Sequence, residues 1–386
     1  MKKTTAIVLI LVLMLSLFGC SQPKQTQEAP QTAANRWHTD GDILITTQEA
    51  DAIIGGTFEK PRNVILIIGD GMGPNDITMA AQYGQGVYDF GLVLDRIVDH
   101  GMCTTYSASS DVTDSAAAAT ALSTGVKTNN GSLGLDAAGN SVKVMMETAR
   151  EAGKKVGIVT DDYITGATPA GFMTHCEDRD EKDQLAASIF AMPPDVLMGR
   201  YDATHYKMAQ NKGGNCLTAL DVSLFAKTLD EAGTIPGTFV GFNSGAKQQA
   251  NNELAYCAQT ALKLLENDNG FFLMIEGCGM DKYGHDNMMQ GKLTSVVNLD
   301  RTVAAVLLYM QAHPDTLLIV TSDHECGGVQ LAPQGIKPDN SLFTATYHTG
   351  VPVRVFAVGQ GSEYFRDVTV DNTDIAKFII AALTQA

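Results

Sequence analysis

The sequence has little positive charge. Only 27 of its 386 residues are Lys or Arg, against 43 Asp and Glu, so the formal net charge is −16. A surface of this sign repels nucleic acid, anionic lipid headgroups and molecules that carry phosphate. The composition therefore argues against nucleic-acid binding. It also requires that any phosphate chemistry depend on positive charge concentrated locally, by metal ions or by a buried arginine.

Cysteine patterns that would hold together a small scaffold are also missing. The chain has seven cysteines and no Cys-x-x-Cys pair, while 45% of its residues are hydrophobic. A chain of this length and composition can bury a core without disulfides. We therefore predict that most cysteines beyond the N-terminus are buried thiols. They are Cys103, Cys176, Cys216, Cys257, Cys278 and Cys326.

The apolar run near the N-terminus, residues 6–18, is too short to span a membrane comfortably. It follows Lys2 and Lys3, and this order is typical of an export signal. The junction LFGC resembles the end of a bacterial lipoprotein signal, which implies lipidation of Cys20 and attachment of the exported protein to the cell envelope. An ordinary cleaved signal peptide is the alternative. If Cys20 is lipidated, its lipid is the only part of the protein that we expect to contact a membrane.

No internal repeat and no interdomain linker follow residue 60. We predict a signal peptide at residues 1–20, a polar tether and N-terminal segment at 21–58, and one folded domain at 59–386. Residues 21–36 are polar and poor in hydrophobic side chains, which is typical of a flexible tether.

Continuous apolar runs alternate with helical patterns along this domain. Runs of this kind are typical of parallel strands that are covered on both faces. The pattern predicts an α/β fold, a three-layer sandwich with a central, mostly parallel sheet. The expected strands are residues 63–69, 155–160, 271–277, 316–324 and 351–359, and the expected helices are 141–153, 293–311 and 373–383.

Polar side chains follow the predicted strands, where ligands of α/β sheets bind. Asp281 and His285 are four residues apart, so they share one face of a helical turn. Singly, each such residue is more often a solvated or capping group. Together they form a set at one sheet edge, and carboxylate with imidazole suits zinc while carboxylate with hydroxyl suits magnesium. The set is Asp70, Thr168, Arg179, Glu276, Asp281, His285, Asp323, His324 and His348.

The stretch VTDSAAAATA at residues 112–121 has two readings. Asp and Ser are common at helix N-termini and alanines allow close packing, so the stretch fits a capped, buried helix. It also fits a nucleophile, Ser115, held at a helix N-terminus where an anion is favoured. The stretch by itself leaves both readings open.

Six motifs together resemble the successive motifs of the alkaline phosphatases. They are IGDGMG, VTDSAAAATALSTGVKT, ATPAGF with the Arg179 that follows it, EGCGMDKYGHD, TSDHE and YHTG. They occur in the same order over roughly residues 60 to 386. The resemblance implies an α/β sandwich that hydrolyses small phosphate monoesters with two zinc ions and one magnesium ion, and it implies a homodimer as the expected assembly.

The resemblance also implies a role for each matching residue. Ser115 is the expected nucleophile and forms a phosphoserine, while Arg179 binds the phosphate with Asp114 beside it. Lys282 is expected to contact the phosphate through water. The expected metal ligands are Asp281, His285 and His348 for the first zinc, Asp70, Asp323, His324 and Ser115 for the second, and Asp70, Thr168 and Glu276 for magnesium.

One position departs from the family pattern. Gly166 stands where many members carry Asp or His near the magnesium, so we expect this ion to exchange readily. Compensation by Lys282, Asp161 or Asp162 is the alternative. Cys278 and Cys326 flank ligand segments, and we interpret them as buried thiols rather than ligands. Residues 326–345 are interpreted as a surface loop.

Other functions fit less well. A sulfatase requires a C/S-x-P-x-R motif, which VTDSAAA lacks. A phosphodiesterase of the same superfamily generally lacks the magnesium ligands, whereas Thr168 and Glu276 are present. A lipid-anchored binding protein without catalysis needs no nucleophile in register with metal ligands. A phosphomonoesterase is therefore the favoured interpretation.

Overall fold

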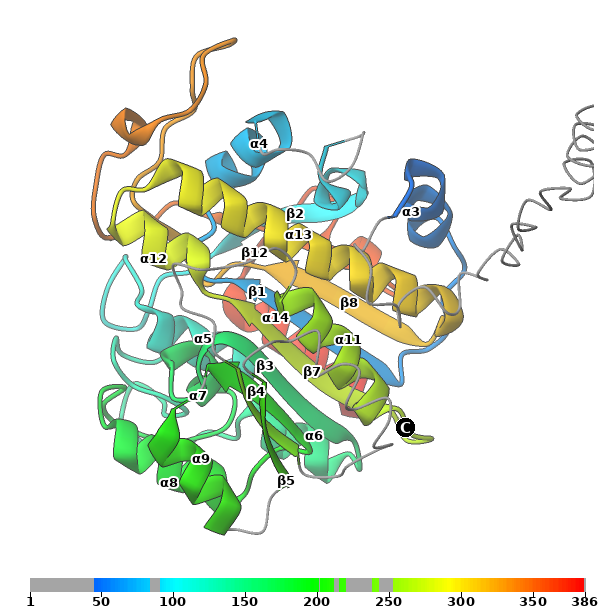
Figure 1. Cartoon of the computed structure of the whole chain (residues 1–386), viewed down its shortest axis with the longest axis vertical. Helices are drawn as coiled ribbons and strands as arrows, with labels where there is room; N and C mark the ends of the chain where they lie inside the picture. The colour runs from blue at the N-terminus through cyan, green and yellow to red at the C-terminus, as the bar shows by residue number, and fades with distance from the viewer. Residues whose placement is uncertain are drawn as a thin grey trace, which may run out of the picture.

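The computed structural model describes residues 45–83, 91–200, 202–211, 215–219, 238–242 and 253–384. The predicted signal, the tether at residues 21–36 and Cys20 lie outside these residues. The division of the chain at residues 20 and 58 therefore stays a prediction. At the centre of the molecule is a ten-stranded sheet with helices on both faces (Figure 1). This arrangement confirms the predicted α/β sandwich.

The strands of the large sheet follow the order β12-β2-β11-β8-β1-β7-β3-β4-β6-β5. A separate antiparallel pair joins β9 and β10. The bounds are β1 Asn63–Gly69, β2 Asp99–Thr104, β3 Lys155–Tyr163, β4 Val196–Arg200, β5 Asn215–Ala219, β6 Thr238–Phe242, β7 Phe271–Gly277, β8 Thr316–Thr321, β9 Glu325–Cys326, β10 His348–Thr349, β11 Val353–Val358 and β12 Thr369–Asp371.

One strand runs against the rest of the large sheet. β11 pairs antiparallel with both β2 and β8, whereas the other described pairs of this sheet are parallel. Grouping residues 351–359 with the parallel strands was therefore wrong. A continuous apolar sequence indicates that a strand is buried on both faces, and this burial does not depend on the direction of the strand.

Side chains of β1 alternate between two cores. Ile65 and Ile67 belong to one core, and Val64, Leu66 and Ile68 belong to the other. This alternation follows from the two-residue period of a strand. The central strand is therefore covered on both faces, which explains its continuous apolar sequence.

Helices α3, α4, α11, α12 and α13 pack on one face of the sheet, and α5, α6 and α14 pack on the other. Figure 1 shows α11 and α13 lying across the near face of the sheet. The bounds are α3 Thr47–Ile54, α4 Pro74–Tyr83, α5 Ser115–Thr124, α6 Met145–Glu151, α7 Ala167–Gly171, α8 Lys182–Ala191, α9 Ala203–Asn211, α11 Glu253–Leu265, α12 Gly279–His285, α13 Met289–Ala312 and α14 Asn372–Thr384, with 3-10 helices η1 Val93–Arg96, η2 Asn340–Leu342 and η3 Ser362–Phe365.

Among the described residues, α13 is the one helix long and apolar enough to cross a membrane. However, 89% of its most apolar window is buried inside the molecule, where α13 contacts α11 and α12. Its composition is that of a core helix. Of residues 326–345, predicted as a surface loop, residues 326–329 are buried and Cys326 belongs to β9, because this part packs under the site. The rest, largely exposed and including the short η2, extends away from the body of the molecule (orange in Figure 1).

Candidate active site

The candidate site lies at the carboxyl ends of the central strands. β1 pairs in parallel register with β7 and β8, and Gly69 lies opposite Gly277. The segments that follow these strands therefore leave the sheet at the same edge. Asp70 follows β1, α12 follows β7, and Asp323 with His324 follows β8. The structure thus brings together residues that are far apart in the sequence.

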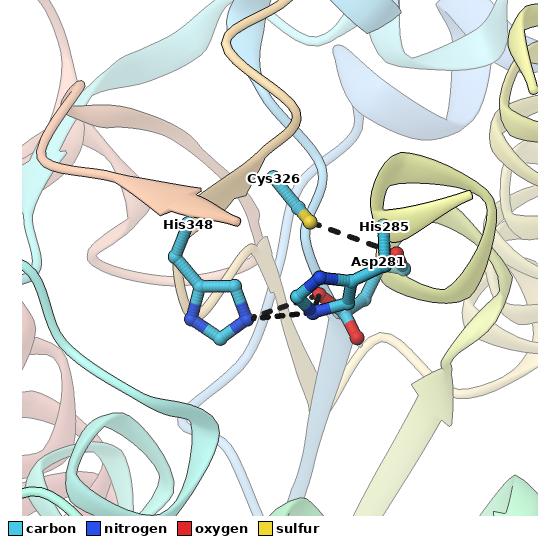
Figure 2. A group of neighbouring side chains, drawn as sticks. All are labelled: Asp281, His285, Cys326 and His348. Carbon is cyan, nitrogen blue, oxygen red and sulfur yellow. Dashed lines mark hydrogen bonds and ion pairs between the residues drawn. The ribbon is translucent and has the colours of Figure 1, made fainter. Parts of the chain in front are cut away.

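The first cluster consists of Asp281, His285 and His348 (Figure 2). Asp281 Oδ1 lies 3.3 Å from His285 Nε2 and 3.2 Å from His348 Nε2. The other ring nitrogens lie beside backbone carbonyls, with His285 Nδ1 2.7 Å from Thr346 O and His348 Nδ1 3.0 Å from Thr113 O. An Nδ1–H that donates to a carbonyl leaves Nε2 as a free lone pair. Both rings therefore present a ligand atom to one point.

The second cluster consists of Asp70, Asp323 and His324. His324 Nε2 lies 3.1 Å from Asp323 Oδ2 and 3.6 Å from Asp70 Oδ1. All three residues are buried. Asp323 is held in place by its Oδ1 atom, which accepts hydrogen bonds from the backbone amides of Gly71 and His324. Its Oδ2 atom is left to face the imidazole.

The donor atoms of both clusters fit metal ions. Asp70 Oδ1, Asp281 Oδ1 and Asp323 Oδ2 are buried and have no hydrogen-bond partner among the described residues. A buried carboxylate oxygen without a partner costs free energy unless a cation neutralises it. In each cluster these oxygens converge with imidazole nitrogens, which is the donor set that zinc prefers. Both clusters are therefore suited to hold zinc.

Ser115 is the first residue of α5, and Asp114 is its N-cap. The Asp114 side chain accepts a hydrogen bond from the Ala117 amide at 2.9 Å. Ser115 Oγ lies 3.2 Å from His324 Nε2 and is buried. The alanines of α5 are buried, and a Cβ added at Gly171 of α7 would lie 2.8 Å from Ala119 Cβ. Small residues therefore let α5 pack closely and bring Ser115 to the second cluster.

Arg179 faces the same helix N-terminus. Its Nη1 atom donates to Asp114 Oδ2 at 3.1 Å, and this oxygen also accepts from the Gly131 amide at 3.0 Å. Burial opposes the charge of the guanidinium, but the carboxylate of Asp114 holds the pKa of Arg179 above its ordinary value. The sequence placed Arg179 and Asp114 at one site, and the structure shows the contact between them.

The residues expected to hold magnesium lie near the second cluster, and each has its own hydrogen-bond or ion-pair partner. Thr168 Oγ1 lies 3.4 Å from Asp70 Oδ2, as a shared ligand set requires. Glu276 accepts a hydrogen bond from Thr160, a residue that the sequence analysis did not single out. Lys282 Nζ lies 2.7 Å from Asp162 Oδ2. Lys282 is thus held at the edge of this set by a neighbouring carboxylate.

Negative charge is crowded in the site. Burial, together with the charges of Asp323 and Asp281, raises the pKa of Asp70 well above its ordinary value. Burial and Asp162 raise the pKa of Glu276 to about 8. Burial also opposes ionisation of Asp281, yet the adjacent imidazoles of His285 and His348 hold its pKa well below the ordinary value. Divalent cations would relieve this repulsion.

The structure adds to the sequence interpretation of Cys326 and shows a second feature that the sequence did not indicate. Cys326 Sγ lies within 4.8 Å of the ligand atoms of the first cluster and donates to the Asp281 carbonyl (Figure 2). Lys292 and Asp76 form a buried ion pair behind the clusters, with a distance of 3.1 Å. The ion pair of Lys292 and Asp76 joins residues far apart in the chain, so no local sequence pattern indicates it. The free, buried state predicted for the cysteines is confirmed for Cys103, Cys176, Cys257, Cys278 and Cys326.

The fold and the site define a class of metal-dependent hydrolases. A family model described as "Alkaline phosphatase" matches residues 61–216 and 242–345. Alkaline phosphatase H of Pseudomonas aeruginosa is 30% identical over an alignment of 408 positions. The alignment covers 84% of this chain and 86% of that protein.

Solved structures give the same result. The cold-active alkaline phosphatase of a psychrophilic Shewanella has a TM-score of 0.74 and 26% identity, and the match covers 84% of this chain and all of that one. A variant of the alkaline phosphatase of the Antarctic bacterium TAB5 with magnesium bound has a TM-score of 0.73 and 27% identity, covering 85% of this chain and 99% of that one. This chain belongs to the alkaline phosphatase family. It is a metal-binding phosphatase that hydrolyses phosphate monoesters.

Proposed function

We propose that the chain hydrolyses phosphate monoesters through a phosphoserine at Ser115, at a site that holds two zinc ions and one magnesium ion. The observation that carries the proposal is the approach of Ser115 Oγ to His324 Nε2, at 3.2 Å. A zinc ion bound by this imidazole would also meet the serine oxygen. Metal contact of this kind activates a hydroxyl that is otherwise a weak nucleophile.

The two clusters supply the proposed zinc ligands. Asp281, His285 and His348 would hold one ion, and Asp70, Asp323 and His324 would hold the other. Asp70, Thr168 and Glu276 would hold magnesium. When bound, the ions neutralise the crowded carboxylates and polarise phosphate oxygens, so that an anionic substrate is attracted to an acidic protein.

The chain's own residues then carry out transfer in two steps. Ser115 Oγ forms a bond to phosphorus while the bond from phosphorus to the alcohol oxygen breaks, and the serine proton goes to the departing alcohol. Water next attacks the phosphoserine, returns one proton to Ser115 and releases inorganic phosphate. Arg179 binds two phosphate oxygens with its planar fork, and Asp114 fixes the direction of that fork. The N-terminus of α5 favours the negative charge, and Lys282 adds a water-mediated contact.

Labelling and turnover test the proposal together. p-Nitrophenyl phosphate should be hydrolysed, and phosphate from a radiolabelled monoester should be recovered on Ser115 after acid quenching. Ser115→Ala should abolish the label and nearly all turnover, whereas Ser341→Ala, at an exposed serine of η2, should change neither. Near wild-type turnover by Ser115→Ala would refute the nucleophile. Faster turnover of bis-p-nitrophenyl phosphate than of the monoester would favour a diesterase instead.

We also propose that the chain is exported and attached to the cell envelope through lipidated Cys20. The LFGC junction supports this proposal. Cys20→Ser should shift the protein from the detergent phase to the aqueous phase while its specific activity is preserved. A wild-type protein with an unmodified N-terminus would contradict it. The expected homodimer also stays a prediction, which light scattering of the purified protein checks.

A further inference from the structure

A cavity of about 570 Å³ adjoins the candidate active site. Arg179 and Lys282 line it, together with Arg200, the last residue of β4. β3 and β4 are parallel neighbours, with Tyr163 opposite Arg200. The cavity therefore lies at the carboxyl edge of the sheet, next to the strands that carry the two clusters. An ester bound by Arg179 would have this space open to its alcohol part.

The cavity concentrates basic side chains in a protein of net charge −16. Four of them line it, namely Arg179, Lys182, Arg200 and Lys282, together with three aspartates and His205. Two of the aspartates are engaged. Asp162 pairs with Lys282 at 2.7 Å, and Asp202 accepts the amides of Thr204 and His205 at the start of α9. The third, Asp183, is exposed in the first turn of α8.

Three of the basic side chains are already bound to protein atoms. Arg179 contacts Asp114 at 3.1 Å, Lys282 contacts Asp162, and Lys182 donates to the carbonyl oxygens of Thr165 and Arg179. Arg200 differs. Its guanidinium lies over the ring of Tyr163, 4.7 Å from the centroid, and it has no carboxylate partner in the described ranges.

The stacking of Arg200 has a chemical consequence. A guanidinium that rests on an aromatic face keeps its N–H groups in the plane, directed away from the ring. These donors match the two oxygens of a carboxylate or a phosphate. His205 Nδ1 is buried and lies 3.8 Å from Asp202 Oδ1, so this ring faces a carboxylate of the protein itself. Among the described residues, Arg200 is thus the basic side chain of the cavity whose donors no carboxylate occupies.

We propose that this cavity binds the alcohol part of the substrate, and that Arg200 recognises a second anionic group on that alcohol. The inference rests on the proposed phosphomonoesterase function. It names the substrate class as phosphate monoesters that carry a carboxylate or a second phosphate. Arg179 binds the phosphate that is removed, and Arg200 binds the group that stays on the product.

Matched substrates test this assignment. 3-Phosphoglycerate and glycerol 3-phosphate have the same carbon chain and differ in a carboxylate, and glycerol 1,3-bisphosphate replaces the carboxylate with a second phosphate. We expect the wild-type kcat/KM to be higher for the two substrates with a second anion than for glycerol 3-phosphate. Comparison of glycerol 1,3-bisphosphate with 3-phosphoglycerate shows which second anion is preferred.

Arg200→Gln should lower the preference for a second anion roughly tenfold, the usual effect of losing a hydrogen bond to a charged group. Arg200→Lys should retain part of it, because the charge stays and the fork is lost.

A charge control separates local recognition from general attraction. Lys337→Gln removes one positive charge from an exposed position in the loop of residues 326–345 and should leave the preference unchanged. Equal kcat/KM values for all three substrates in the wild type, or an unchanged preference in Arg200→Gln, would overturn the inference while the phosphatase function stands. No turnover of any of the three would instead count against the proposed function.

Discussion

The carboxylate of Asp162 lies next to the position that a side chain at residue 166 would occupy. A Cβ added at Gly166 would lie 3.4 Å from Asp162 Oδ2 and 3.0 Å from Tyr163 O. The carboxylate of Asp162 also holds Lys282, and both charges act on Glu276. A residue four positions earlier thus supplies negative charge beside the proposed magnesium ligands, where Gly166 supplies none.

This arrangement predicts the effect of Asp162→Asn. The amide would leave the charge of Lys282 unbalanced beside the magnesium ligands, and the ion would bind more weakly. Loss of a supporting group typically weakens metal affinity ~10–100-fold. We expect the magnesium concentration for half-maximal activation of the dialysed protein to rise by about tenfold. Asp183→Asn, at an exposed aspartate of the same cavity, is the control. Equal magnesium dependence in both variants would contradict the role of Asp162.

Asp300 of α13 gives a pH-dependent contribution to stability. It accepts the amides of Val93 and Leu94 at 2.9 Å each, and burial raises its pKa to about 7. The folded protein therefore binds this proton more tightly than the unfolded chain, whose aspartates titrate near the ordinary value of 3.8. The contribution of Asp300 to the free energy of unfolding is fully present below about pH 4 and is lost as the pH rises to about 7.

The comparison with Asp300→Asn isolates this effect. The free energy of unfolding of the wild type, minus that of the variant, should fall by up to about 4 kcal/mol between about pH 4 and pH 7, and stay level above that. Urea unfolding of both metal-free proteins across this range measures it. A difference that does not change with pH would show that Asp300 has the same pKa in the folded and unfolded states.

Single residues of the site were predictable where a motif carries them. Asp70, Ser115 and the pair Asp323 and His324 stand in short stretches that are ambiguous singly, and they became informative only as an ordered set of motifs. Arg200 was not singled out, because its partner Tyr163 lies on a neighbouring strand. The pairing of Arg200 with Tyr163 depends on the register of β3 against β4, which the sequence does not state.

Three ligand-bearing segments meet at one buried ammonium group. Lys292 Nζ donates to the carbonyl oxygens of Gly71, Met280 and Cys326, at 2.8, 3.1 and 2.9 Å. These residues lie after β1, in α12 and in β9, each within two positions of a proposed zinc ligand. Asp76 of α4 balances the charge. Lys292 therefore connects the elements that position both clusters.

Removing this connection should cost both stability and metal affinity. Lys292→Met leaves Asp76 buried without a counter-charge, which typically costs about 3–5 kcal/mol. The double variant Lys292→Met with Asp76→Leu should recover much of the free energy of unfolding. It should still lose zinc faster than the wild type during dialysis, as measured by metal analysis. Wild-type zinc retention in the double variant would show that Lys292 serves stability alone.

Elements with continuous apolar sequence were predictable, and the edges of the sheet were not. β1, β7 and β8 are buried along their whole length. β2 alternates between buried and partly exposed residues, and β12 has three residues, so neither forms an apolar run. The direction of β11 was also missed, because a strand buried on both faces has the same composition in either direction.

Across the whole molecule, metal removal should lower stability. The clusters hold buried carboxylates that repel one another, and an ion that binds the folded state stabilises it by about 4 kcal/mol when its concentration is a thousandfold above Kd. We expect a chelator to lower the Tm and added zinc to restore it. Calorimetry on dialysed samples measures the change, with sodium sulfate as an ionic-strength control. An unchanged Tm would mean that the folded and unfolded chains bind zinc equally.

The proposed ligands run from Asp70, just after the first strand, to His348, just before β11. No short fragment of the chain holds a complete site, and contacts between such distant segments form late in folding. Catalysis therefore requires that the last of these segments has folded onto the rest. If the proposed signal directs the chain out of the cell interior before it folds, the active site forms only after export. A precursor exported in this way would not hydrolyse the phosphate esters of the compartment in which it is made.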